Sequence, residues 1–276
     1  MEICNNVHQI RINFNVTDKI ERYVYIYLIT GRRCYLIDTG TAGCEAKIGR
    51  YMEGIGRRLE EVAAVFLTHA HPDHIGSAAA LKRITGCKVY APEKEKAWIE
   101  NIDLQFKERP IPNFYALAGE SVSVDEAAWQ GHIISPETDV TLRAVETPGH
   151  SAGSVSYVFE EEQVIFTGDT VPAPDDLPII TDVRESIQSI QKLRTQEHIQ
   201  YLCPAWDRVY EGRETKKVLD RSGELLDRLR QCVIQTQKRY PGRTAAEKTE
   251  LIKADMGWGH LDSNPLFAAS IKACIE

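Results

Sequence analysis

Hydrophobic and polar positions alternate with a period of two near the start of the chain. The segment VHQIRINF (7–14) alternates in this way, and YVYIYLI (23–29) and CYLID (34–38) are runs of β-branched and aromatic residues. A short apolar run, VAAVFLT (62–68), is typical of a buried strand. Residues 42–55 instead place apolar side chains at helical spacing. This part of the chain therefore predicts a sheet with at least one helix beside it.

The same alternation between strands and helices continues to about residue 205. We expect helices at 75–86 and about 182–197, and strands at 87–91, 139–147, 154–161, 163–169 and 199–205. Residues 92–135 contain prolines, charge clusters and aromatics, and fit a helix plus an extended surface segment. Two runs of strands, each followed by helices, favour mixed sheets with helices outside.

From residue 212 the pattern becomes helical. Apolar residues recur every four or seven positions, at Val218, Leu225, Leu229 and Val233. Pro241 and Gly242 interrupt this helix, and two more helices are predicted after them. We therefore expect one domain of strands and helices over residues 1–211 and a helical region over 212–276 that packs on it.

Composition narrows the function classes. The chain has 276 residues, 43% of them hydrophobic and 26% charged, which is ordinary for a soluble globular protein. Its net charge of −7 provides no general attraction for nucleic acid. The seven cysteines form no C-x-x-C pair, so neither a disulfide framework nor a structural zinc knuckle is expected. The sequence has no signal-peptide pattern and no apolar run of roughly 18 residues. We expect a cytoplasmic protein that does not cross a membrane.

Four side chains that can bind metal lie within six positions of the segment FLTHAHPDHIGS (66–77). They are His69, His71, Asp73 and His74. Imidazole nitrogen and carboxylate oxygen suit zinc, iron or manganese. His69 and His71 follow a predicted strand, where side chains two apart point the same way. Asp73 and His74 lie at the start of the next helix and point to a second position, although Asp73 could simply cap that helix.

Two later strand ends repeat this arrangement. His150 follows a strand in TPGH, and Asp169 follows another in TGDT. A glycine precedes each of them and allows the backbone to turn sharply. Each motif alone fits an ordinary turn, but both come after a strand and after the histidine cluster.

Together these motifs resemble the metallo-β-lactamase superfamily. The matching segments are LIDTG (36–40), the cluster at 69–74, TPGH (147–150) and TGDT (167–170), and they cover about residues 20 to 207. The resemblance implies an α/β protein, an αββα sandwich of two mixed sheets flanked by helices, with a metal site at one edge. It also implies a role for each motif residue. The first ion would bind His69, His71 and His150, the second would bind Asp73 and His74, Asp169 would bridge them, and Asp38 would orient a ligand from the second shell.

One family ligand is missing from the sequence. The superfamily usually provides a last histidine in a P-G-H-G motif, where this chain has Pro204-Ala205-Trp206-Asp207. An indole cannot bind metal. Either Asp207 replaces the histidine at the second ion, or the site holds one ion and Asp207 pairs with a neighbour such as Arg208. A third alternative is that His260 folds back from the helical region.

The resemblance implies a dinuclear metal-dependent hydrolase, most similar to the hydroxyacylglutathione hydrolase (glyoxalase II)-like group. Zinc is the expected metal, with iron or manganese as alternatives. We expect a metal-bridged hydroxide to attack a thioester, ester or lactone of a small molecule, with Asp73 handling the proton. Exposed tail helices are compatible with a homodimer. Basic residues in that tail would meet an anionic substrate or form a solvated helix face; they include Lys216, Lys217, Arg221 and Arg228.

Three other functions remain open from the sequence. A mononuclear iron enzyme similar to persulfide dioxygenases would use His71, His150 and Asp169. A phosphodiesterase is a second alternative within the same superfamily. A non-catalytic metal-binding module is the third. Metal content and a substrate panel distinguish them.

Overall fold

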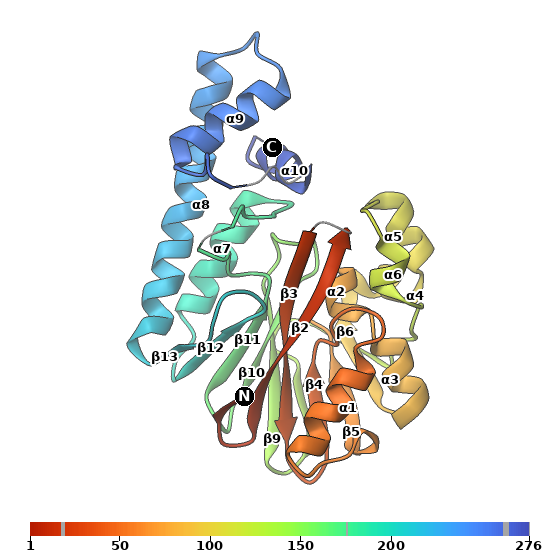
Figure 1. Cartoon of the computed structure of the whole chain (residues 1–276). Coiled ribbons are helices and arrows are strands. Elements are labelled where there is room, and N and C mark those ends of the chain that lie inside the picture. Colours follow the sequence, from red (N-terminus) through yellow and green to blue (C-terminus); the bar gives the residue numbers. More distant parts are fainter. Residues whose placement is uncertain (18–19, 175, 262–264, 276) are drawn as a thin grey trace.

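Two β-sheets face each other, and helices cover both outer faces (Figure 1). The computed structural model describes residues 1–17, 20–174, 176–261 and 265–275. Both sheets combine parallel and antiparallel neighbours, and helices follow the sandwich at the C-terminal end. The αββα sandwich with a helical C-terminal extension is therefore confirmed.

The first sheet contains seven strands in chain order within the described residues. They are β1 (Glu2–Cys4), β2 (Val7–Thr17), β3 (Ile20–Thr30), β4 (Cys34–Ile37), β5 (Val62–Phe66), β6 (Lys88–Pro92) and β7 (Glu126–Ala128). Strands β1 to β4 are antiparallel neighbours, and β4 to β7 are parallel. β2 and β3 extend beyond the apolar runs that predicted them, because their polar ends pair with each other, as Asn15 does with Glu21.

The second sheet has the order β13-β12-β11-β10-β9-β8 among the described residues. Its strands are β8 (Ile133–Glu137), β9 (Val140–Glu146), β10 (Val155–Phe159), β11 (Val164–Gly168), β12 (Tyr201–Pro204) and β13 (Tyr210–Glu211). β12 runs parallel to β11, and the other neighbours are antiparallel. β9, β11 and β12 therefore run in the same direction, and their carboxyl ends lie at the same edge.

Short helices cover the outer face of the first sheet. They are α1 (Glu45–Gly54), α2 (Pro72–Ile75), α3 (Ala78–Thr85), α4 (Lys96–Glu100), α5 (Ile102–Glu108) and α6 (Phe114–Ala118), with 3-10 turns η1 (Leu59–Glu61) and η2 (Glu93–Glu95). The helix expected at 75–86 corresponds to α3, with Gly86 as its left-handed C-cap, but it begins three residues later than expected because a separate short helix, α2, ends just before Gly76. The Gly76 N–H donates to the Gly40 carbonyl (2.8 Å), and a Cβ there would lie 2.2 Å from the Leu117 carbonyl oxygen. This close backbone packing ends the first helix.

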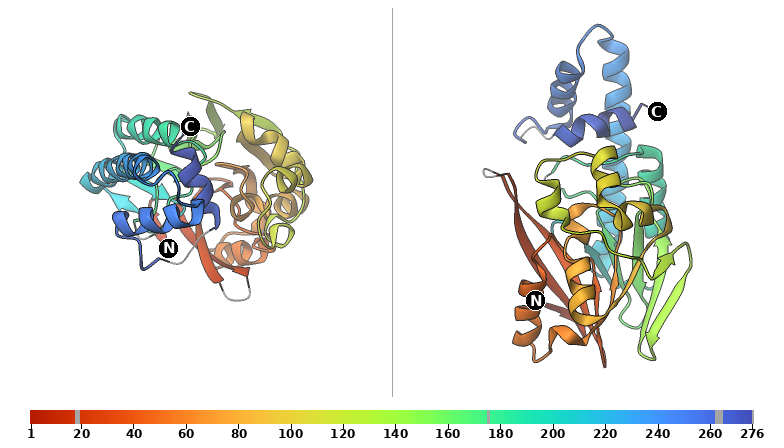
Figure 2. Two further views of the ribbon diagram at one scale, coloured as in Figure 1. Left: turned by 90° about the horizontal axis from the view of Figure 1, so that it is seen from above. Right: turned by 90° about the vertical axis from the view of Figure 1, so that its right-hand side faces the viewer.

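The remaining helices of the described residues lie along the second sheet or at one end of it. They are α7 (Val183–Arg194), α8 (Arg213–Arg239), α9 (Ala245–Met256) and α10 (Pro265–Ala273). Val158 and Ile165 of the sheet share one hydrophobic cluster with Leu226 of α8 and Phe267 of α10. Figures 1 and 2 show α8 running along the sandwich and α9 and α10 gathered at one end of it. The helical region thus packs on the second sheet.

Aromatic side chains fill the space between the two sheets. Phe66 stacks on Tyr90 at 4.7 Å and meets the edge of Tyr157 from the opposite sheet at 5.6 Å. Near the end of β5, the Val155 N–H donates to the Thr68 carbonyl (2.9 Å), which joins the two sheets directly. This contact brings the residues after β5 beside the second sheet. No helix in the described ranges is long and apolar enough to span a membrane.

Candidate metal centre

The sequence motifs meet at one edge of the sandwich because the strands that carry them run in the same direction. Asp38 follows β4 and His69 follows β5, which are parallel neighbours in the first sheet. His150 and Asp169 follow β9 and β11, which point the same way in the second sheet. The carboxyl ends of four strands therefore bring together residues that are more than 100 positions apart.

Three imidazoles converge at this edge. Nδ1 of His71 lies 3.0 Å from Nε2 of His69 and 2.8 Å from Nε2 of His150. All three residues are buried, and one nitrogen of each lies within 4.8 Å of the others. This is the donor type and the close spacing that a divalent ion such as zinc needs. The three are the residues expected at the first ion.

A second group lies beside the first. His74 Nε2 is 3.1 Å from Asp169 Oδ1, and together with His69 these side chains form another set that could hold an ion. Asp169 Oδ2 lies 3.4 Å from His150 Nε2, so this carboxylate lies between the two groups. Asp73 is at the rim, with its carboxylate 3.7 Å from His74 Nε2 and its side chain 20% exposed. It is outside both of the compact sets but close enough to reach the second.

The local fold after β5 places these side chains. His71 is extended, with ψ at 147°, and Pro72 is the first residue of α2. Proline is pre-organised for that position, where a missing N–H costs nothing. His74 follows one turn later, and the Thr39 N–H and hydroxyl both donate to its carbonyl, at 2.7 and 2.9 Å. The cluster is thus held by the turn that follows β4.

A hydrogen bond holds the far side of three of these histidine rings. His74 Nδ1 donates to Asp38 Oδ2 at 2.8 Å, and His150 Nδ1 donates to the Ile179 carbonyl at 2.7 Å. The Thr68 hydroxyl donates to Asp38 Oδ2 and therefore accepts from His69 Nδ1, 3.0 Å away. Such bonds select the tautomer and turn Nε2 toward the site. Asp38 thus contacts His74 directly and His69 through Thr68.

Asp38 is itself held in an unusual backbone conformation. Its φ is +60°, in the left-handed region that residues other than glycine rarely adopt. Its N–H donates to the Phe66 carbonyl (3.0 Å), and the Thr68 N–H donates to its Oδ1 (2.8 Å). These bonds hold a strained residue at a candidate functional site.

Burial and mutual repulsion keep most of the histidines neutral. Burial lowers the pKa of His69 and of His71 well below the ordinary value, and neighbouring positive groups add to the effect. Burial also lowers the pKa of His150, although the Asp169 carboxylate opposes it. A neutral imidazole has the free lone pair that metal binding requires.

The acidic side chains near His74 act in the opposite direction and favour its protonated form. Burial opposes a charged His74, but Asp169, Asp38 and Asp73 outweigh burial and raise its pKa well above the ordinary value. Burial raises the pKa of Asp73. For Asp169, burial acts in the same direction but His74 and His150 prevail, so its pKa is lowered. Three carboxylates around one imidazole form a negative site.

Buried polar atoms without partners show where a cation fits. His71 Nε2, His74 Nε2 and Asp169 Oδ1 are buried and have no hydrogen-bond partner. Buried polar atoms normally have one, so unpartnered atoms at a site call for an explanation such as an ion. His74 Nε2 and Asp169 Oδ1 belong to the second group, whereas His71 faces the first group with Nδ1 and not with Nε2. The residues present therefore fit a metal ion in donor type, in charge and in their unpartnered atoms.

The PAWD segment occupies the position of the missing family ligand. The Trp206 indole lies beside Asp169 and helps to lower the pKa of its carboxyl group, and its ring packs against Tyr23 at 5.7 Å between centroids. The Asp207 carboxylate accepts a hydrogen bond from the Tyr210 hydroxyl, and Asp207 belongs to neither donor set. His260 is exposed beyond α9 and belongs to neither set. The indole thus contacts the carboxylate that lies between the two groups.

Glu95 is a site residue that the sequence did not reveal. Its side chain is buried, and Oε1 accepts from the Ser151 hydroxyl and the Gly153 N–H, both at 2.7 Å. Oε2 accepts from the N–H of Ala70, between His69 and His71, at 3.2 Å. One carboxylate therefore joins the loop of the histidine cluster to the loop of His150. Glu95 lies in the segment without periodicity, so no sequence signal pointed to it.

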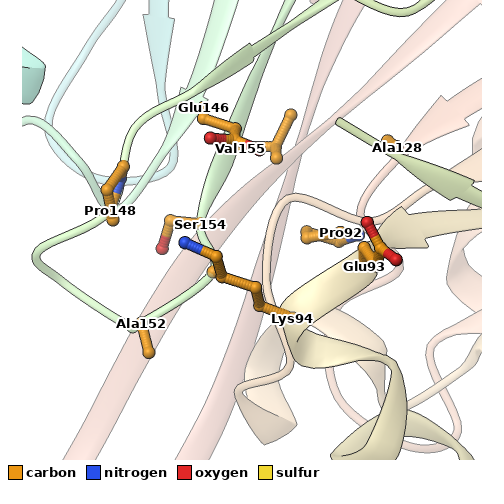
Figure 3. A pocket seen from close by; sticks show the side chains of 10 residues that line it. Pro92, Glu93, Lys94, Ala128, Glu146, Pro148, Ala152, Ser154 and Val155 are labelled. Atoms are coloured by element: carbon orange, nitrogen blue, oxygen red, sulfur yellow. The ribbon is translucent and has the colours of Figure 1, made fainter. Parts of the chain in front are cut away.

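A small hollow lies behind the His150 loop (Figure 3). Its volume is about 40 Å³, and it is lined on one side by Pro92 and Lys94 and on the other by Pro148 and Ser154. Figure 3 shows the Lys94 side chain extending toward Ser154. A space of this size holds water rather than an organic substrate. This hollow is therefore too small to be a substrate site.

A two-sheet sandwich with histidine and aspartate donors at the carboxyl edge of its strands is the architecture of a metalloprotein, and sequence comparison assigns the family. The family model described as the Metallo-beta-lactamase superfamily matches residues 20–198. That is more than half of the chain, so the chain belongs to this superfamily. The resemblance drawn from the motifs is confirmed.

Curated relatives and solved structures agree with this assignment. A hydroxyacylglutathione hydrolase of Nitrobacter hamburgensis is 33% identical over 132 residues, 48% of this chain and 43% of the relative. One from Nitrobacter winogradskyi is 37% identical over 107 residues, 39% of this chain and 33% of the relative. In both cases the match spans less than half of the relative's length.

Two similar structures include the helical region. A metallo-beta-lactamase family protein from Thermus thermophilus has a TM-score of 0.75 at 17% identity, covering 98% of this chain and 92% of the other. A beta-lactamase domain protein from Burkholderia ambifaria has a TM-score of 0.71 at 16% identity, covering 99% and 86%. At these identities the similarity establishes the fold.

Proposed function

We propose that this chain is a metal-dependent hydrolase that cleaves a thioester, ester or lactone of a small molecule, with two divalent ions, zinc foremost. The observation that carries the proposal is the convergence of His69, His71 and His150 next to the His74–Asp169 pair. The name of the curated relatives, hydroxyacylglutathione hydrolase, supports an acyl bond as the one cleaved.

We assign the ligands of the two ions from the two groups of donor side chains. His69, His71 and His150 would hold the first ion, Asp73 and His74 the second, and Asp169 both. Ions held there would lower the pKa of a bound water toward neutrality and polarise the substrate carbonyl. Asp207 is left out of this set, because its carboxylate already accepts a hydrogen bond from Tyr210.

Other side chains prepare the site for this reaction. Asp38 keeps His74 oriented, and Glu95 keeps the two ligand loops at a constant separation. Asp73 is the proposed proton-handling residue, because its carboxylate is partly exposed at the rim and can touch the substrate. No serine or cysteine nucleophile is needed.

The decisive experiment is a substrate panel with a metal analysis. Protein purified without added metal is analysed for bound metals and assayed on thioesters, lactones and phosphodiesters with zinc, manganese or iron. We expect two zinc ions per chain and hydrolysis of acyl bonds, abolished in His71→Ala. Hydrolysis of phosphodiesters alone would instead assign a phosphodiesterase. Absence of tightly held metal would leave a non-catalytic module and contradict the proposal.

One observation favours a second function, a mononuclear iron dioxygenase acting on persulfides. The Trp206 indole lies beside Asp169 where the family usually has another ligand, which leaves the second position with fewer donors. His71, His150 and Asp169 would then hold a single ion. One iron per chain, together with oxygen consumption in the presence of a persulfide, would establish this alternative over the hydrolase.

A further inference from the structure

Arg109 is a cation beside the metal centre that has no ion pair in the described part of the chain. It is the residue after the end of α5 and is partly buried. Its side chain forms neither a hydrogen bond nor a salt bridge with any described residue. Arginine cannot lose its charge in a protein, and a buried charge without a partner is unfavourable. The position therefore calls for a ligand.

The backbone of α5 is anchored to the histidine loop. Gln105 is fully buried, and its Nε2 donates to the carbonyl of Ala70, between His69 and His71, at 2.7 Å. The Arg109 N–H donates to the Gln105 carbonyl at 2.7 Å, so Arg109 lies one helical turn further along. The backbone of Arg109 therefore lies within one turn of the residue that anchors α5 to the metal loop.

The charge of Arg109 acts on both donor groups. For His71, burial is the main cause of the lowered pKa and the Arg109 charge is the next. Burial lowers the pKa of Arg109 itself, while Asp73, Asp169 and Glu95 raise it. These effects fall with distance, so the guanidinium lies close to the ligands expected at each ion. Among the described residues, however, no carboxylate lies within ion-pair distance of Arg109.

We propose that Arg109 binds a carboxylate of the substrate, so that the metal centre acts on anionic acyl compounds in preference to neutral ones. A guanidinium presents two parallel N–H groups that match a carboxylate. The three acidic side chains nearby favour a monoanion over a phosphate dianion, which they would repel more strongly. Arg109 is thus a specificity-determining residue. The kinetic test of this inference, described next, rests on the proposed hydrolase function.

The kinetic test uses two thioesters that differ only in charge. They are S-acetylthioglycolate, which carries a carboxylate, and its neutral amide, S-acetylthioglycolamide. In zinc-loaded Arg109→Gln we expect KM for the charged thioester to rise about 10- to 100-fold, the loss expected for a hydrogen bond to a charged group. Kinetic constants for the neutral amide should stay within about twofold of those of the unmodified protein.

Lys107→Ala is the matched control. It removes the same charge from the same helix, but Lys107 is exposed. Both thioesters should be hydrolysed by it as by the unmodified protein. Arg109→Lys keeps the charge and loses the planar fork, so its KM for the charged thioester should be intermediate. This variant also serves if Arg109→Gln does not fold or loses zinc.

A binding test separates this inference from the hydrolase proposal. Calorimetry on the zinc-loaded protein compares N-acetylglycine with N-acetylglycinamide, neither of which contains a thioester. The preference for the carboxylate should fall at least about tenfold in Arg109→Gln and persist in Lys107→Ala. If the preference is unchanged in Arg109→Gln, or if both thioesters suffer equally, the inference is wrong. If the unmodified protein hydrolyses neither thioester, the hydrolase proposal fails while the calorimetry still decides the role of Arg109.

Discussion

The carboxylate of Asp38 lies 2.8 Å from Nδ1 of His74, and both side chains are buried. The same carboxylate accepts from the N–H and the hydroxyl of Thr68, which in turn holds His69. One residue after β4 therefore orients a donor at each of the two groups. Because the outer partners of metal ligands set ring orientation and basicity, this relationship should control metal affinity.

The first prediction concerns Asp38. Asp38→Ala should lower metal affinity about 10- to 100-fold, because His74 and His69 lose the bonds that orient them. Metal affinity is measured by competition with a chelator of known affinity. Asp38→Asn keeps part of the hydrogen bonding and should lose less. Equal affinities in Asp38→Ala and the unmodified protein would show that the rings are oriented by other contacts.

The second prediction concerns His71, the nitrogen donor between His69 and His150. His71→Ala should remove the first ion and abolish acyl-bond hydrolysis, because two remaining donors do not form a tight site. The measurement is metal content after dialysis, alongside turnover. His198→Ala is the control, because that histidine is 83% exposed and belongs to neither donor set. Full metal content and activity in His71→Ala would remove His71 from the site.

The third prediction concerns the glycine that precedes His150. Gly149 has φ at +126°, and a Cβ there would lie 2.3 Å from the backbone nitrogen of Ser186. Gly149→Ala should therefore cost about 1–3 kcal/mol in the free energy of unfolding and weaken metal binding through His150. Urea unfolding and metal competition measure the two effects. Gly43→Ala is the control, since Gly43 has φ at +81° but nothing within 4 Å of an added Cβ.

The fourth prediction concerns Trp206. Trp206→His should place an imidazole where the indole now contacts Asp169, and should raise the affinity for the second ion. Zinc titration with a metal indicator gives the stoichiometry and both affinities. Trp206→Phe removes the indole N–H without adding a donor, so it should not strengthen the second ion. If both variants bind metal alike, the imidazole does not reach the ion.

The fifth prediction concerns pH and the metal-free protein. His69, His71 and His150 have lowered pKa values in the fold, so between those values and about 6.5 the unfolded chain binds more protons. Stability should therefore fall as pH falls below about 6.5. His74 has a raised pKa and is protonated in both states there, while the raised pKa of Asp73 opposes the trend in part.

Urea unfolding in the presence of a chelator, between about pH 5 and 7.5, measures this dependence. His71→Asn removes one of the three groups and should make the dependence less steep. His198→Ala, which removes an exposed histidine, should leave it unchanged. A dependence that is equally steep in His71→Asn would show that this histidine does not contribute.

The local sequence pattern determined most secondary-structure elements and most donor residues of the site. Strand and helix periodicities predicted most elements of the sandwich and the helical C-terminal region, because each such segment must bury one face. The donor residues of the histidine cluster, His150 and Asp169 were also visible, because glycine, proline and donor side chains recur at strand ends. The short edge strands β1, β7, β8 and β13 were not predicted, since so few residues carry almost no period.

Only the tertiary structure decided which further residues surround the metal centre at the edge of the sandwich. Glu95 and Arg109 lie in a segment without periodicity. Glu95 bonds to the histidine loop directly, and α5, which ends just before Arg109, is anchored to the same loop through Gln105. Asp207 is the reverse case. It is adjacent in sequence to the missing ligand position, but its carboxylate bonds to Tyr210 while Trp206 contacts Asp169. Sequence specifies which side chains are available near a strand end, whereas their partners are set by three-dimensional packing of distant segments.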